Sequence, residues 1–233
     1  MAELVEVEVD GSPMRICTAS PSGDGPFPAV LVTIHGGGID DFEFDLADKL
    51  ASEGYISAAP DIFHRQPEGL DRTAKREALT DDGLIADANA GVAWLESTGR
   101  ADLGRAAILG HCMGGRHAYL GASVNPVYRC VVAYYGGNMF VPWGHDGLSP
   151  FDRLSNLKVP VIGFYGNDDV NPSPDDVNKI DAELDKLGVT HEFHRYDGAG
   201  HAFQNFMSDE SYREGPTKDS WSRTVAFLKQ HIG

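Results

Sequence analysis

The amino-acid sequence predicts an α/β fold, in which helices cover both faces of a mostly parallel sheet. Short apolar segments alternate along the chain with segments whose apolar residues recur at helical spacing. The most apolar segments show no polar alternation, as expected of strands buried on both faces, and Gly-rich stretches follow several of them. With 233 residues, of which 42% are hydrophobic and 23% charged, we expect one globular domain over residues 1–233.

The first predicted element is a hairpin with one solvated face. Residues 5–9 alternate apolar and acidic side chains, a turn containing glycine and proline follows at 10–13, and residues 14–17 resume the strand.

Strands and helices then alternate. Phe42, Leu46 and Leu50 recur at helical spacing and Gly54 follows them, which predicts a helix over residues 41–53. Similar spacing predicts further helices at residues 84–95, from 113 onward, at 177–187 and at 221–232. Strands are predicted at residues 29–34, 55–62, 106–109, 130–135, 159–165 and 190–196. Residues 65–76 are predicted to be a polar loop, and residues 136–149 a loop at the entrance of the ligand crevice.

The charge balance limits the partners. The 35 acidic residues against 19 lysines and arginines give a net charge of −16, which repels nucleic acid and anionic lipid surfaces. The N-terminus lacks the pattern of a signal peptide, and no apolar run approaches the roughly 20 residues of a membrane span. Three cysteines without a C-x-x-C pair fit a reduced compartment. We therefore expect a cytoplasmic monomer or homodimer that acts on a small molecule.

A cysteine stands where this topology places a catalytic nucleophile. Residues 110–114 follow a predicted strand and precede a predicted helix, as in the G-x-S-x-G nucleophile elbow, with Cys112 replacing serine. The strained turn needs neighbours without bulk, which Gly110 and Gly114 provide, and the helix N-terminus favours a thiolate. The alternative is that Cys112 is a small buried residue in a Gly-rich turn.

Candidate partners for Cys112 follow two later strands. Asp168 and Asp169 come after the strand at 159–165, and His201 lies in a Gly-rich loop after the strand at 190–196. The order nucleophile, acid, histidine is the order of the α/β-hydrolase topology, in which the three loops meet at one edge of the sheet. Taken singly, the aspartates could be turn or cap residues and His201 a loop histidine. Their joint occurrence favours a catalytic triad.

The Gly-rich loop after the first buried strand supplies candidate oxyanion donors. His35, Gly36, Gly37 and Gly38 resemble the loop that contributes one backbone N–H, the other coming from the residue after the nucleophile. We assign the two donors to Gly36 and Met113. The loop is also compatible with a tight turn that needs positive φ.

The other histidines give no metal site. His191 and His194 are three residues apart on a predicted strand, so they point to opposite faces. No ligand spacing is found for the remaining candidates, which are His64, His111, His117 and His145. We expect neither a metal nor a cofactor.

Together these motifs resemble the dienelactone hydrolase (carboxymethylenebutenolidase-like) family. The cysteine elbow is the most specific match, and further similarity at 50–55, 59–65, 165–169 and 200–203 extends over nearly the whole chain. The resemblance implies that Cys112 is the nucleophile, His201 the general base and Asp169 the orienting acid. Counting back from Pro172 selects Asp168 instead.

Two positions depart from the family's namesake. A glutamate three residues before the loop glycine is replaced by His35 in a gapless alignment. An arginine that holds the substrate carboxylate, four residues after the histidine, is replaced by Asn205. We therefore expect His35 and Asn205 at substrate-binding positions. The candidates for the missing arginine are Arg65, Arg72, Arg76 and Arg213.

The expected activity is cleavage of a carboxylic ester or lactone through a thioester acyl-enzyme, with a dienelactone-type substrate among the candidates. Two other classes remain as alternatives. A thiol redox protein would cycle Cys112 through oxidised forms, but no resolving cysteine lies nearby in the sequence. A catalytically inactive hydrolase fold used for binding would explain the departures at His35 and Asn205.

Overall fold

The computed structural model describes residues 1–67, 69–144 and 147–233. All eight of its strands belong to one sheet with the order β1-β2-β4-β3-β5-β6-β7-β8. The strands are β1 (Glu3–Val9), β2 (Ser12–Ala19), β3 (Phe27–Thr33), β4 (Ile56–Pro60), β5 (Ala101–His111), β6 (Tyr128–Tyr134), β7 (Val161–Gly166) and β8 (His191–Tyr196). His145 and part of the predicted entrance loop lie outside the described residues.

The strand directions confirm the predicted fold class. β1 and β2 form the expected antiparallel hairpin, and β2 also runs antiparallel to β4. All pairs from β4 through β3, β5, β6 and β7 to β8 are parallel. The carboxyl ends of these parallel strands therefore meet at one edge of the sheet, where the candidate residues follow β3, β5, β7 and β8.

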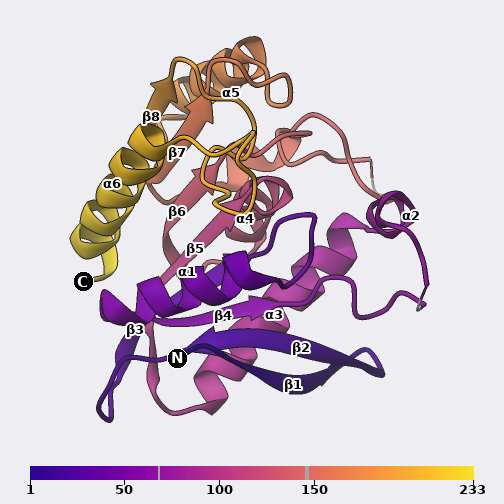
Figure 1. The fold of residues 1–233 in the computed structure, drawn as a ribbon, viewed down its shortest axis with the longest axis vertical. Helices are drawn as coiled ribbons and strands as arrows, with labels where there is room; N and C mark the ends of the chain where they lie inside the picture. Colours follow the sequence, from indigo (N-terminus) through magenta and orange to yellow (C-terminus); the bar gives the residue numbers. More distant parts are fainter. Residues whose placement is uncertain (68, 145–146) are drawn as a thin grey trace.

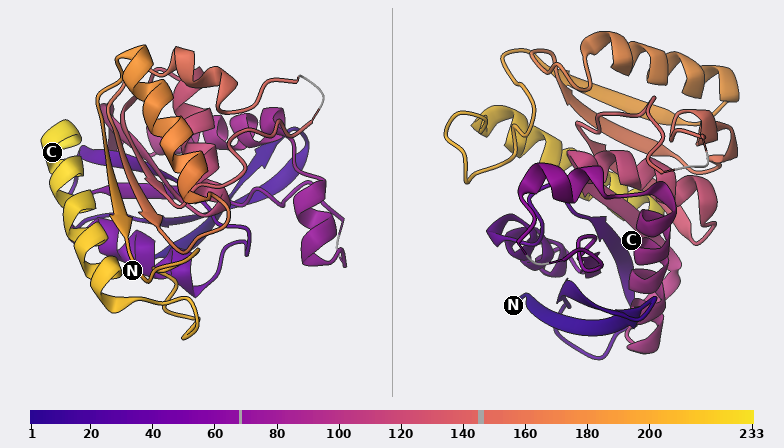
Figure 2. Two further views of the ribbon diagram at one scale, coloured as in Figure 1. Left: turned by 90° about the horizontal axis from the view of Figure 1, so that it is seen from above. Right: turned by 90° about the vertical axis from the view of Figure 1, so that its right-hand side faces the viewer.

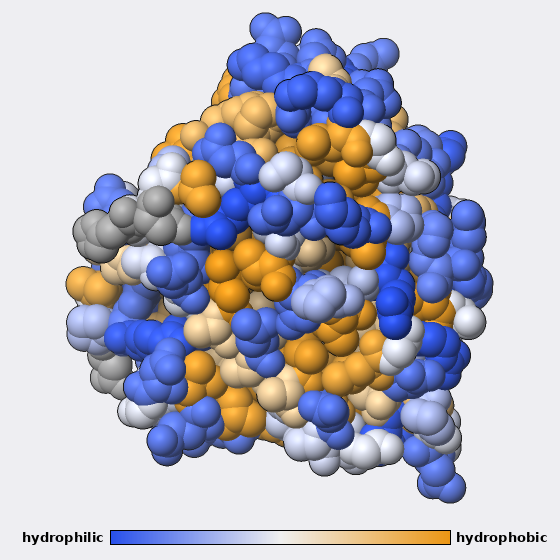
Figure 3. Space-filling model, turned by 180° about the vertical axis from the view of Figure 1, so that it is seen from behind, coloured by the Kyte–Doolittle hydropathy of each residue, from blue (hydrophilic) through white to orange (hydrophobic). Residues whose placement is uncertain are grey.

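Helices cover both faces of the sheet (Figure 1, Figure 2). Core residues of α1 and α6 pack against one face, and core residues of α3, α4 and α5 pack against the other. The helices are α1 (Asp41–Ser52), α2 (Arg72–Glu77), α3 (Asp81–Ser97), α4 (Met113–Val124), α5 (Pro174–Leu187) and α6 (Glu214–Ile232), with a short 3-10 helix at Asp152–Asn156. On the back of the molecule, apolar residues lie among polar ones (Figure 3).

The helix α2 was not predicted, because residues 65–76 carry no apolar periodicity. It has six residues, none of them buried, and it begins after Asp71, whose side chain accepts hydrogen bonds from the backbone of Thr73 and Ala74. Figure 1 shows α2 at the outer edge of the molecule, away from the sheet. No helix of the described residues has the length and apolar character needed to cross a membrane.

Candidate active site

Cys112 occupies the sharp turn between β5 and α4. Its backbone has φ 57° and ψ −122°, a conformation that is costly for a residue with a side chain and that is typical of functional turns. A Cβ at Gly110 would collide with the carbonyl of Gly114, and a Cβ at Gly114 would collide with the carbonyl of Thr33. The elbow therefore needs glycine at both positions, because strand and helix approach too closely for any larger residue.

The loops after β7 and β8 bring an acid and a histidine to this cysteine. His201 Nε2 lies 2.9 Å from Cys112 Sγ, and His201 Nδ1 lies 2.8 Å from Asp169 Oδ2. The second oxygen of Asp169 accepts the backbone N–H of Asn171 at 2.9 Å. Asp169 is buried and Asp168 is exposed, so of the two aspartates the structure brings Asp169 to the histidine.

The contacts around Cys112 favour its charged form. Burial raises the pKa of the thiol, but the hydrogen bond and charge of His201 and the backbone N–H groups of Met113 and Gly36 lower it, with a net pKa of about 7. Burial lowers the pKa of His201, whereas its bonds to Asp169 and Cys112 raise it to about 10. Near neutral pH the pair is thus poised as a thiolate and an imidazolium.

The two expected oxyanion donors lie beside the sulfur. The backbone N–H groups of Gly36 and Met113 both form hydrogen bonds that stabilise the Cys112 thiolate. On the other side of this loop, Arg72 Nε and Arg76 Nε each donate to the Gly36 carbonyl oxygen at 3.2 Å. The Gly36 backbone is therefore held from both sides.

Cys112 and His201 open into a cavity of about 650 Å³, a size suited to a small organic ligand. His35 and Asn205, the two positions that depart from the family pattern, both line it. The amide oxygen of Asn205 accepts the Met207 N–H at 3.0 Å, and its amide nitrogen has no partner among the described residues.

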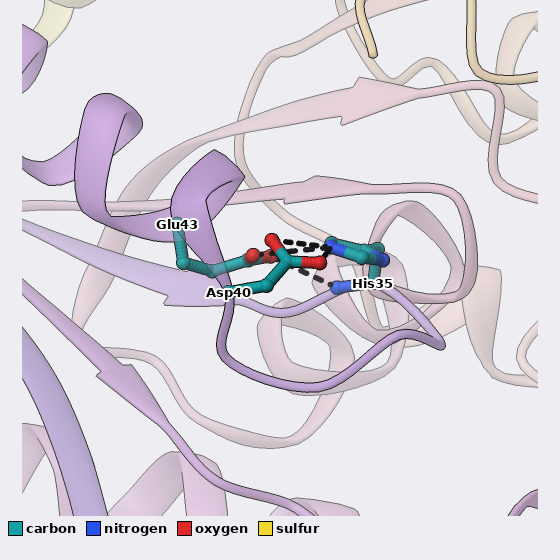
Figure 4. Close-up of side chains that lie close together, drawn as sticks. All are labelled: His35, Asp40 and Glu43. Carbon is teal, nitrogen blue, oxygen red and sulfur yellow. Dashed lines mark hydrogen bonds and ion pairs between the residues drawn. The ribbon is translucent and has the colours of Figure 1, made fainter. Parts of the chain in front are cut away.

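The ring of His35 is engaged on both sides by the protein. Its Nδ1 accepts the N–H of Gly37 at 2.9 Å, and its Nε2 lies 3.1 Å from Glu43 and 3.2 Å from Asp40 (Figure 4). Asp40, Glu43 and His35 have the ligand types of a metal site. A metal-bound imidazole, however, donates its second N–H to an acceptor, whereas Nδ1 here faces an N–H donor. We assign no metal to this cluster.

Among the candidate arginines, only Arg72 and Arg76 line the cavity. Arg65 is paired with Asp87 and Asp10. Arg213 donates to the backbone carbonyl oxygens of residues 198, 210 and 212. Arg72 and Arg76 have no carboxylate partner among the described residues, and burial, together with the charge of Arg72, lowers the pKa of Arg76.

A buried ion pair fixes the described part of the entrance loop. Arg116 and Asp81 are both fully buried and form a two-point pair at 2.5 and 3.1 Å. Arg116 also donates to the carbonyls of Asn138 and Val141, and Asp81 accepts the N–H of Trp143. Asn138 and Trp143 line the cavity. No local pattern in the sequence indicates this pair, because its members lie 35 positions apart in the chain.

Sequence reasoning also missed Glu43, although a signal was present. Glu43 precedes Leu46 by three residues and Leu50 by seven, so helical geometry places it on the same buried stripe of α1. An acid on a buried stripe is costly unless it is paired, which marks it as a candidate for a special role.

A thiol on a strained strand-to-helix turn, with a histidine and an acid presented by later loops of a mostly parallel sheet, defines the α/β-hydrolase class. Residues 14–232 match the model of the dienelactone hydrolase family, and the chain belongs to that family. It is therefore a hydrolase of the ester or lactone type.

Relatives in this family cover nearly the whole chain. A Methylorubrum extorquens protein provisionally named carboxymethylenebutenolidase is 32% identical over 99% of this chain and 81% of its own length. A Bradyrhizobium protein provisionally named 2-oxo-3-(5-oxofuran-2-ylidene)propanoate lactonase is 30% identical over 99% of this chain and 94% of its own length. A Klebsiella pneumoniae structure provisionally named dienelactone hydrolase has a TM-score of 0.89 with 31% identity and covers 99% of both chains.

Proposed function

We propose that this protein hydrolyses a carboxylic ester or lactone through a thioester on Cys112, with His201 as the acid-base group and Asp169 as its orienting partner. The observation that carries the proposal is the continuous line of contacts from Asp169 through His201 to Cys112, at 2.8 and 2.9 Å. This is the geometry that an activated nucleophile requires.

The residues account for both halves of the reaction. The Cys112 thiolate attacks the carbonyl carbon, and the oxyanion forms between the N–H groups of Gly36 and Met113. As the C–O bond breaks, the His201 imidazolium gives its proton to the leaving alkoxide. The neutral His201 then takes a proton from the water that attacks the thioester, and the released carboxylic acid leaves the thiolate and imidazolium restored.

The two arginines on α2 support a substrate with an anionic group. Among the described residues, no carboxylate is paired with Arg72 or Arg76 where they line the cavity, in a chain of net charge −16. Each guanidinium has donors beyond the Nε–H that binds Gly36. A carboxylate on the acyl or leaving part of the substrate would neutralise this pair. The provisional name of the Bradyrhizobium relative refers to a compound of that kind, a propanoate that carries a lactone ring.

The structure offers little support for the redox alternative. Cys17 and Cys130 are free and fully buried within β2 and β6, where burial raises the pKa of each thiol to about 12. Neither is poised to resolve an oxidised Cys112. The inactive-binder alternative leaves unexplained why a charged histidine and a buried acid are aligned on the thiol.

Intact-protein mass spectrometry after brief incubation with p-nitrophenyl esters and unsaturated lactones tests the proposal. We expect an acyl adduct, or product release, that Cys112→Ala lacks and that the control Cys17→Ala retains. Product release that persists in folded Cys112→Ala would exclude the thioester route. Absence of both adduct and turnover across neutral and carboxylate-bearing substrates would favour the inactive binding fold.

A further inference from the structure

The loop that carries the Gly36 donor is tied to a buried carboxylate. Glu43 projects from the first turn of α1 toward His35, and its side chain is 1% exposed (Figure 4). Its Oε1 accepts the backbone N–H of His35 at 3.3 Å, and its Oε2 lies 3.1 Å from His35 Nε2. One carboxylate therefore holds both the backbone and the ring of the residue that precedes Gly36.

The ring of His35 extends this restraint to the residue that follows Gly36. Its Nδ1 accepts the Gly37 N–H at 2.9 Å. A Cβ at Gly37 would collide with the His35 ring, so the ring packs directly against the loop backbone. Gly36 thus lies between two residues that are both fixed by one imidazole, and its own N–H is one of the groups that lower the pKa of the Cys112 thiol.

Asp40 completes the cluster and fixes the tautomer of the ring. Its carboxylate oxygens lie 3.2 and 3.3 Å from His35 Nε2, and one of them also accepts the Phe42 N–H at the start of α1. Since Nδ1 accepts the Gly37 N–H, the ring proton sits on Nε2, where Asp40 Oδ1 accepts it at 3.3 Å and Glu43 Oε2 lies 3.1 Å away. Burial lowers the pKa of His35, whereas the bonds and charges of Glu43 and Asp40 raise it to about 9; a second proton, on Nδ1, would break the bond to Gly37. Burial raises the pKa of Glu43 to about 7, which reduces the repulsion between the two carboxyl groups.

We propose that Glu43 and His35 are positioning residues, which hold the Gly36 N–H on the thiolate of the resting enzyme and on the oxyanion of the reaction. The proposal rests on the proposed function of Cys112. Neither residue touches the sulfur or the substrate carbonyl in this role. They act through the loop backbone, and the arginines of α2 hold the opposite side of the same loop.

The test compares two reactions of Cys112 in Glu43→Gln. In this variant an amide NH2 faces the Nε2 proton of His35, so the loop loses its anchor. Ester acylation builds an oxyanion, whereas alkylation by iodoacetamide builds none. We expect acylation to slow about 10- to 100-fold, less than the roughly 10²- to 10³-fold loss of a whole donor. Alkylation by the fully formed thiolate should change less than about 2-fold, since it needs no donor.

The pH dependence of alkylation provides a second readout, which does not require hydrolase activity. Weaker donation from Gly36 should raise the pKa of Cys112 in Glu43→Gln. His35→Asn, which keeps an acceptor near Gly37 but cannot reach Glu43, should show a smaller loss of acylation than His35→Phe. Asp45→Asn, on the same helix and paired with Lys49 at the surface, should match the wild type in every reaction.

Equal loss of acylation and alkylation in Glu43→Gln, or no change in either, would overturn the proposal, as would an unchanged pKa of Cys112. If Glu43→Gln does not fold, the two His35 variants decide by the same comparison. Loss of wild-type alkylation or acylation on chelator treatment, with recovery on adding Zn²⁺, would make the cluster a metal site and overturn the proposal. If the wild-type protein shows no acylation, the hydrolase proposal itself is refuted. The comparison of the Cys112 pKa between the wild type and Glu43→Gln still tests the role of the loop.

Discussion

At Cys112, burial and hydrogen bonding act on the thiol in opposite directions, and hydrogen bonding has the larger combined effect. The side chain is largely enclosed, yet its pKa falls to about 7 because a histidine and two backbone N–H groups converge on the sulfur. The same two N–H groups, those of Gly36 and Met113, would receive the substrate oxygen. A single arrangement of donors thus serves the resting thiolate and the reaction that we propose for it.

The two neighbouring aspartates provide a matched pair of variants. Asp169→Asn replaces the acceptor of the His201 Nδ1 proton by an amide, so kcat should fall by the order of 10²-fold or more. Asp168→Asn makes the same change at an exposed position and should leave kcat within about 2-fold. The measurement is kcat of the wild type and of both variants, from steady-state kinetics on one ester. Equal losses in the two variants would remove Asp169 from the proposed triad.

The pH profile of the proposed reaction follows from the Cys112 and His201 pair. Cys112 must be deprotonated to attack, so kcat/KM should decline as pH falls below about 7. His201 must be protonated to release the leaving group, so kcat/KM should also decline above about 10. In His201→Ala the alkylation of Cys112 should titrate at higher pH, because the main cause of the lowered pKa is gone. An unshifted titration would contradict the ion pair.

At the scale of elements, α2 is the least integrated part of the site. It has no buried residue, and its contacts with the body include the bonds from Arg72 and Arg76 to the Gly36 carbonyl. A helix of this kind presents charged groups to the cavity instead of adding to the core. Its sequence carries no apolar pattern, which explains why a loop was predicted here.

Variants of α2 should separate substrates by charge. Arg72→Gln or Arg76→Gln should lower kcat/KM about 10-fold for a carboxylate-bearing ester or lactone, as expected for loss of a charged hydrogen bond in a partly solvated site. A neutral ester of the same acyl size should react at nearly the wild-type rate. Lys75→Gln makes the same charge change on the same helix without lining the cavity and serves as the control. Equal losses on both substrates would assign the arginines to the Gly36 loop alone.

The sequence predicted the elements that a local pattern marks, and it missed the features that need long-range pairing. Helices α1 and α3 to α6 were marked by apolar residues at helical spacing, and strands β3 to β8 by short, mostly apolar segments. Cys112 and His201 could be located because their loops follow predicted strands. Asp168 and Asp169 are adjacent in the sequence, so the choice between them needed the three-dimensional contact between Asp169 and His201. The Arg116–Asp81 pair spans 35 positions, which no local pattern reveals.

For the whole molecule, the buried histidines make stability depend on pH. His111 stacks on Tyr134 and bonds Gln204 in the interior, and burial lowers its pKa to about 3. His117 is also buried, has no hydrogen-bond partner at either ring nitrogen among the described residues, and has a pKa far below its usual value. Below pH 6.5 the same two histidines bind protons in the unfolded chain, whereas in the folded state they remain neutral.

The sign of the effect is a loss of stability on acidification. Each of these histidines contributes stability above pH 6.5, the usual pKa of histidine, and loses it as pH falls toward the folded pKa. The slope approaches about 1.4 kcal/mol per pH unit for each group. Glu43, whose pKa is raised by burial to about 7, acts in the opposite direction over part of this range. A comparison between variants is therefore needed to isolate one histidine.

His117→Phe isolates the contribution of that ring. The variant keeps an aromatic side chain in the interior and removes a group that the unfolded state would protonate. The free energy of unfolding is measured with urea at about pH 6.5, 5.75 and 5.0, a range that begins at the usual pKa of histidine and extends below it. On acidification it should fall less steeply in the variant than in the wild type, by up to about 1.4 kcal/mol per pH unit. Parallel curves for the two proteins would mean that His117 is protonated in the folded state, and hence that its surroundings are more polar than the packing of α4 indicates.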